Sequence, residues 1–181
     1  MDPELVIAKR CVDNRTARHV LVAHGNAVAG LALELAKRID QPVDLDFLRE
    51  AAILHDVGML ETRIPQLGCH GPYPYICHGV LGRRMLDEEG LPGHALVCER
   101  HVGLGLTARE IRRQKLPLPV RDMVPETVEE KLVCYADKFF SKYGLDRPRM
   151  KTIEEVEQEA GTFGPDNLAV LHRMKKLFGV P

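Results

Sequence analysis

The chain has 181 residues, of which 45% are apolar and 28% are charged, and its formal net charge at pH 7 is −1. This length and composition predict one ordinary globular domain that can bury a core without disulfides or a structural metal. The near-neutral charge and the lack of an apolar run of roughly 20 residues argue against stable nucleic-acid binding and against a membrane span.

Helix-start signals and apolar spacing define the elements of the first half of the chain. Asp2-Pro3 is a typical helix start and predicts a short helix to about residue 13. A long helix is predicted from about 15 to 40, with one apolar stripe at Val20, Ala27, Val28, Leu31 and Leu35. Asp44 or Asp46 caps a third helix, which is expected to stop near Gly58, and residues 59–75 are predicted to be a loop.

The second half is also predicted to be helical. The expected helices cover about 76–89, 92–102, 107–115, 126–142 and 165–178. Capping boxes at 107–110 and 152–155 mark two further helix starts, and residues 116–125, with three prolines, predict a second loop. No segment alternates convincingly as a strand. We therefore expect an all-α, single-domain bundle of seven to nine helices.

Four polar residues stand in apolar helical surroundings. His24 lies on the apolar stripe of the long helix, His55-Asp56 follows an apolar run at 51–54, and Asp137 lies within the apolar stretch 132–140. Buried imidazoles and carboxylates need partners, and each one alone is satisfied by a backbone carbonyl, a cap or a salt bridge. Adjacent helical residues point about 100° apart, but the backbone can turn at a helix end. As a set, the four predict a site for Mn, Fe, Zn, Co or Ni.

The order His24, His55-Asp56 and Asp137 resembles the HD superfamily of metal-dependent phosphohydrolases. Residues 51–58 are close to the central motif of that superfamily, and His78-Gly79-Val80 and residues 99–103 resemble the extra histidines of its HDIG branch. The stretch 116–138 is similar to a little-characterised prokaryotic group in that branch. The resemblance covers about 15–142, which implies an HD core there and leaves a C-terminal helical extension at about 150–181.

The resemblance implies two metal ions. One would be bound by His24, His55, Asp56 and Asp137, and Asp56 would also reach a second ion held by His78 and His101. His70 and His94 are competitors for the second pair. We expect His19 and His172, which lie off the shared face and outside the resemblance, to be surface or core histidines without a ligand role.

One position departs from the HDIG pattern. Many members carry a lysine, thought to help with phosphate, where this chain has Met59. Arg63 is the nearest replacement for substrate binding, although it could equally be a solvated loop residue. Further cations, which could bind phosphates or simply form a solubilising face, are Arg83, Arg84, Arg109, Arg112, Arg113 and Lys115.

The function implied by the resemblance is hydrolysis of a nucleotide or similar small phosphoester by metal-activated water, with Asp56 as the central catalytic residue. Two alternatives stay open. One is an HD domain that binds a nucleotide or a partner without turnover, and the other is a di-iron HD-type oxygenase. Five cysteines without a two-residue spacing, and an acidic N-terminus, favour a reduced, cytoplasmic protein.

Overall fold

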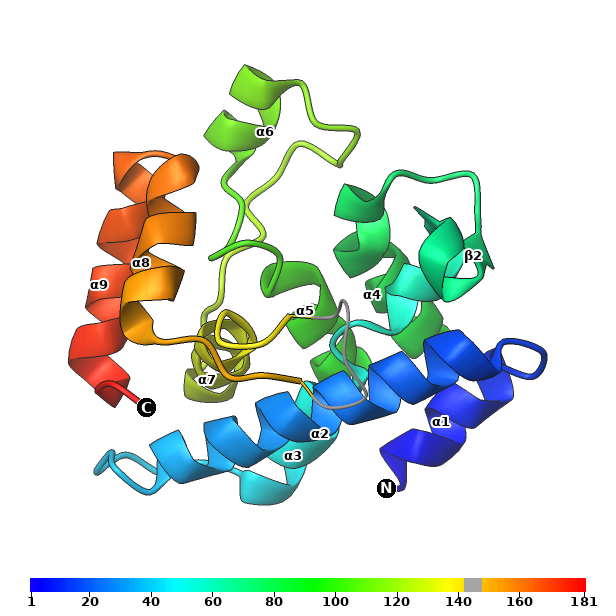
Figure 1. The fold of residues 1–181 in the computed structure, drawn as a ribbon, viewed down its shortest axis with the longest axis horizontal. Helices are drawn as coiled ribbons and strands as arrows, with labels where there is room; N and C mark the ends of the chain where they lie inside the picture. Colours follow the sequence, from blue (N-terminus) through cyan, green and yellow to red (C-terminus); the bar gives the residue numbers. More distant parts are fainter. Residues whose placement is uncertain (142–147) are drawn as a thin grey trace.

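A computed structural model describes residues 1–141 and 148–181, and helices dominate this part of the chain (Figure 1). It confirms the predicted all-α class. The nine α-helices of the described residues are α1 (Pro3–Arg10), α2 (Arg15–Ala36), α3 (Leu45–Leu54), α4 (His78–Glu88), α5 (Pro92–Arg100), α6 (Ala108–Gln114), α7 (Val128–Asp137), α8 (Ile153–Thr162) and α9 (Pro165–Phe178).

The predicted helix starts are confirmed by side-chain caps. Asp44, rather than Asp46, caps α3 by accepting a hydrogen bond from the backbone N–H of Phe47. The two predicted capping boxes, at 107–110 and 152–155, form in both directions and begin α6 and α8. These caps satisfy backbone donors that the first turn of a helix otherwise leaves without partners.

The long helix α2 runs along one edge of the molecule and packs on α3 and α7 (Figure 1). A glycine next to His24 allows the close approach of α2 to α3. A Cβ on Gly25 would lie 2.8 Å from the backbone Cα of Ile53, so only glycine lets α2 and α3 approach this closely. The buried face of α2 therefore carries His24 into the centre of the domain rather than onto the surface.

By length and composition alone, α2 is also long and apolar enough to cross a membrane, contrary to the expectation that no segment approaches this limit. The criterion is weak, because core helices meet it as well. In this protein, 44% of the relevant window is buried inside the domain. We attribute the apolar character of α2 to that packing.

The prediction of a loop at 59–75 is wrong in part, because this segment forms short ordered elements. A 3-10 helix η1 (Val57–Glu61) leads into strand β1 (Arg63–Ile64), a second 3-10 helix η2 (Pro65–Leu67), strand β2 (Cys69–His70) and, beyond it, η3 (Tyr75–Cys77). The strands pair antiparallel, with Ile64 opposite Cys69. The chain reverses direction between the strands at Gly68. Its φ of 69° lies in the left-handed region, which favours glycine.

Several helices end earlier than predicted. α2 ends at Ala36 rather than near residue 40, and α7 covers Val128–Asp137 rather than 126–142. The predicted end of that helix at 142–144 lies outside the described residues. The apolar run beyond Asp137 does not continue the helix, because the carbonyl of Phe139 accepts a hydrogen bond from the backbone of Lys151.

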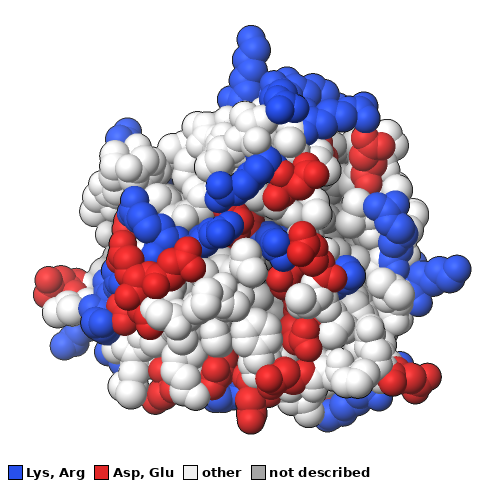
Figure 2. All heavy atoms as spheres, turned by 180° about the vertical axis from the view of Figure 1, so that it is seen from behind, with Lys and Arg blue, Asp and Glu red and all other residues white. Residues whose placement is uncertain are grey.

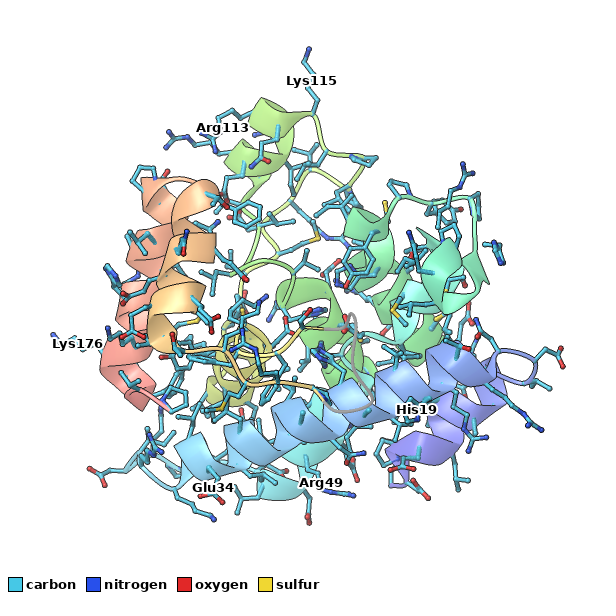
Figure 3. All side chains as sticks on the ribbon, viewed as in Figure 1. His19, Glu34, Arg49, Arg113, Lys115 and Lys176 are labelled. Atoms are coloured by element: carbon cyan, nitrogen blue, oxygen red, sulfur yellow. The ribbon has the colours of Figure 1, made fainter. Side chains whose placement is uncertain are left out.

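Two further parts of the fold are the pair α8 and α9 and the single helix α6. α8 and α9 are antiparallel neighbours on one side of the molecule, and α6 projects at the top (Figure 1). Lys and Arg side chains gather at this top end, whereas both signs of charge are interspersed elsewhere on the face seen in Figure 2. The labelled Arg113 and Lys115 point away from the body of the protein (Figure 3).

Candidate metal centre

The fold brings the predicted ligands together in two groups that share Asp56. The first ligand group is His24, His55, Asp56 and Asp137, and the second ligand group is Asp56, His78 and His101. Within each group, one potential ligand atom per residue lies within 4.8 Å of all the others. All six side chains are buried, and they come from α2, the ends of α3, α5 and α7, and the start of α4.

Asp56 directs one carboxylate oxygen toward each group. Its Oδ2 lies 3.4 Å from Nε2 of His24 and 3.2 Å from Nε2 of His55. Its Oδ1 lies 3.4 Å from Nε2 of both His78 and His101. This is the arrangement in which one carboxylate can serve two ions, and it is made possible because Asp56 leaves helical geometry, with φ −104° and ψ 4°.

Three of the histidines are fixed in the same orientation. In each, Nδ1 donates to the backbone carbonyl three residues earlier, which turns Nε2 toward the centre. This internal hydrogen bond is the usual way in which a protein sets the tautomer of a metal-binding imidazole. The pairs are His55 with Ala52 at 2.6 Å, His78 with Tyr75 at 2.7 Å and His101 with Cys98 at 2.8 Å.

The second ligand group requires a positive charge between its imidazoles. Nε2 of His78 lies 3.1 Å from Nε2 of His101. With both Nδ1 atoms donating elsewhere, two neutral rings would point lone pairs at each other across this distance. A proton or a metal ion between them removes the repulsion, so this donor set fits a divalent transition metal.

The central motif is held by a close approach of two backbones. A Cβ on Gly58 would lie 2.0 Å from the carbonyl oxygen of His78 and 2.2 Å from the backbone nitrogen of Gly82. Gly58 is therefore needed for packing η1 against α4, and not as the helix stop that the sequence suggested. This contact places Asp56 and His78 beside each other.

Comparison with known proteins agrees with this geometry. The family model described as "HD domain" matches residues 21–141. The chain belongs to the HD-domain family. The fold also resembles the HD domain of the Listeria monocytogenes phosphodiesterase PgpH, with a TM-score of 0.52 and 13% identity over 93% of this chain and 94% of that one. Membership of the HDIG branch and the boundary between core and extension stay predictions.

Relatives of known sequence do not supply an activity. An uncharacterized protein of Methanocaldococcus jannaschii is 36% identical, and the match covers 80% of each chain. Two proteins named tRNA (cytidine(56)-2′-O)-methyltransferase, from Picrophilus torridus and Thermoplasma volcanium, are 33% and 29% identical. The match covers 71% and 87% of this chain but only 33% and 42% of those proteins.

The carboxylates control the protonation of the HD site. Burial lowers the pKa of His55, but the carboxylates of Asp56 and Asp137 outweigh it and raise this pKa to about 9. Burial also lowers the pKa of His101, and here it prevails over Asp56. The protein therefore keeps a proton among the ligands of the first group, where a cation offsets the two buried carboxylates.

A cavity of about 290 Å³ is lined by His78, His101 and Asp137, so it reaches both ligand groups. Lys138 also lines it, and its Nζ lies 2.8 Å from Oδ2 of Asp137. Lys138 was not singled out from the sequence, because nothing in the spacing shows that the residue after a ligand faces the cavity. Lys138 therefore supplies a cation beside the predicted metal ligands. Met59, which stands where many HDIG members carry a lysine, is fully buried and apolar and supplies none.

The other candidates lie away from the ligand groups. His94 interacts with Glu50 at 3.2 Å, and His70 is exposed on β2, so neither is brought to the cluster. His19 and His172 are exposed, as expected. Arg63 is exposed on β1 and is not among the described residues that line the cavity, so its role in substrate binding stays a prediction.

The predicted cations fall into two sets. Arg83 and Arg84 form ion pairs with Glu99 and Glu61, respectively, which ties them to the protein surface. The cations of α6 and its end lie at the projecting tip, of which Arg113 and Lys115 are labelled in Figure 3. Neither set contributes to the residues that line the 290 Å³ cavity.

Proposed function

We propose that this HD-domain protein is a metal-dependent phosphohydrolase that acts on a nucleotide or a similar small phosphoester. The observation that carries the proposal is the geometry of Asp56, whose two oxygens face separate histidine groups. Ligands of this kind suit Mn, Fe, Zn, Co or Ni, and two such ions clamp the attacking and leaving oxygens in many phosphatases and nucleases.

Separate sets of residues would hold the two ions. His24, His55 and Asp137 would hold one ion, His78 and His101 the other, and Asp56 both. When bound, the ions supply Lewis acidity and lower the pKa of a coordinated water toward 7.

The phosphoryl group would lie where the cavity meets these ligands. Lys138 extends to this point and can donate hydrogen bonds to phosphate oxygens, the contact that Arg63 was expected to make. Asp137 holds the Lys138 ammonium close to the ligands.

A small soluble substrate is the partner that fits the cavity best. Its volume of about 290 Å³ is at the lower end of the range of small-molecule sites, about 300–1,000 Å³. The five cysteines are all free and buried, which supports the predicted cytoplasmic location. Because relatives are named as tRNA methyltransferases, RNA ends belong among the substrates to be tested.

The test is a panel of phosphomonoesters, phosphodiesters, cyclic nucleotides and RNA oligonucleotides with terminal phosphates, assayed with each of the five metals on protein purified without a histidine tag. Turnover should depend on metal and should fall by at least a hundredfold in Asp56→Ala. His172→Ala is the control, because this histidine is exposed and outside both ligand groups. Equal turnover by Asp56→Ala, or none by the wild type on any substrate, would refute the proposal.

A further inference from the structure

The hairpin of α8 and α9 presents an unusual aromatic side chain to the metal-site cavity. Phe163 follows Val156 and Ala160 at helical spacing, so it continues the face of α8 that packs inward. Val156 and Ala160 are buried, yet Phe163 is 71% exposed. Phe163 directly follows the last residue of α8 and lines the cavity together with Lys138, with most of its side chain open to solvent.

A polar residue on α9 follows the same pattern. Asn167 precedes Leu171, Met174 and Phe178 on the buried face of the helix. Asn167 is half-buried and lines the cavity at the start of this face. Gln114, an exposed residue at the end of α6, also lines the cavity, three residues after the buried Ile111.

The rest of the cavity wall is apolar. Tyr75 lies at the metal end, where its ring stacks on His78 at a centroid distance of 4.4 Å and an interplanar angle of 14°. The apolar side chains of the wall are Ile76, Val102, Leu106 and Leu116. The cavity is thus lined by charged candidate ligands and Lys138, by apolar side chains, and by an aromatic ring and two amides.

We propose that α8 and α9 form a nucleobase-binding wall, so that the substrate is a mononucleotide whose base stacks on Phe163 and whose edge bonds to Asn167 and Gln114. This inference rests on the proposed function, because it assumes that the phosphoryl group lies at the metal ligands. An exposed aromatic ring is the common platform for stacking a base. Asn and Gln side chains are the amides that pair with the edges of bases, adenine above all.

The amides distinguish a base from an aliphatic chain. A cavity made for an alkyl group gains nothing from Asn167 and Gln114, which would lose hydrogen bonds to water when covered. A neighbouring cavity of about 190 Å³ shares Gly103, Lys138, Phe163 and Asn167 with the first, which extends the space beside the proposed wall.

The experiment measures binding rather than turnover. Manganese-loaded wild-type protein is titrated calorimetrically with phosphonate analogues of the four nucleoside monophosphates and with methylphosphonate, which lacks base and ribose. Octylphosphonate and a short RNA oligonucleotide are titrated in the same way. Wild type should bind at least one nucleotide analogue more than tenfold more tightly than methylphosphonate. Phe163→Ala should weaken nucleotide binding by about tenfold, Asn167→Ala should also weaken it, and neither should change methylphosphonate binding.

Leu177→Ala is the matched control, because this residue is a 55% exposed apolar side chain on α9 and does not line the cavity. Equal affinities for methylphosphonate and all nucleotide analogues would overturn the inference. So would octylphosphonate binding as tightly as the nucleotides, binding of RNA oligonucleotides alone, or no effect of Phe163→Ala. Base-dependent binding without turnover of any phosphoester would instead refute only the proposed function.

Discussion

Removal of the His78 imidazole should reduce the metal content of the protein from two ions per chain to one. The second ligand group consists of Asp56, His78 and His101, so His78→Ala leaves it two of three side chains. The first group keeps all of its four ligands, because His78 is not part of it. The variant should therefore lose one ion on dialysis and retain the other.

The stability change follows from the same count. At a free metal concentration of about a thousand times Kd, each bound ion stabilises the folded state by about 4 kcal/mol. For a chain of this size, 1 kcal/mol shifts Tm by roughly 2–4 °C, so loss of one ion should reduce the metal-induced increase in Tm by about 8–16 °C. Each protein is compared with its own chelated form, which cancels the cavity left by the substitution.

Metal analysis after dialysis gives the stoichiometry, and thermal unfolding monitored by circular dichroism gives the shift. His94→Ala is the control, because this histidine is also largely buried but pairs with Glu50 outside both ligand groups. A wild type that never takes up more than one ion at saturating metal would refute the assignment of two groups. So would a His78→Ala protein that retains two.

Three further predictions test other parts of the centre. Gly58→Ala should destabilise the protein by about 3 kcal/mol or more in denaturant unfolding, because the added Cβ would overlap the carbonyl of His78. Gly30→Ala is the control: it has open space on α2 and should be neutral or stabilising by up to about 1 kcal/mol. Similar free energies of unfolding for the two variants would contradict this prediction. Because the pKa of His55 is about 9 without metal, uptake at pH 7 should release a proton and tighten as pH rises toward 9; calorimetric heats that do not depend on the buffer would argue against it. Lys138→Met should lower kcat/KM by about tenfold or more with metal content unchanged, while Lys138→Arg retains most activity; the reasoning fails if Met and Arg behave alike.

Four of the six candidate ligands could be found from the sequence because each of the four breaks an apolar pattern. His24 on the inward stripe of a helix and Asp137 inside an apolar run both predict buried polar groups that need partners. The sequence cannot show that these groups meet, and the resemblance to the HD superfamily provided that step. The His78 and His101 pair depended on it fully, since His94 lies on the same helix with similar surroundings.

The cavity wall could not be predicted in this way. Phe163 and Asn167 continue the inward faces of α8 and α9, but spacing alone predicts only burial for the first and a surface position for the second. Their role depends on where the hairpin ends relative to Lys138, which tertiary packing sets. The short strands at 63–64 and 69–70 escaped prediction for a related reason, because two-residue strands are too short to show alternation.

The charges of the site connect metal binding to substrate binding. Without metal, the carboxylates of Asp56 and Asp137 are balanced by the ammonium of Lys138 and the imidazolium that the high pKa of His55 maintains. This balance leaves the site with little attraction for a phosphate dianion. Two divalent ions that replace the protons on the imidazoles would leave a strong positive excess beside the cavity. Phosphonate binding should therefore require metal, and Lys138 alone cannot replace it because Asp137 already neutralises it.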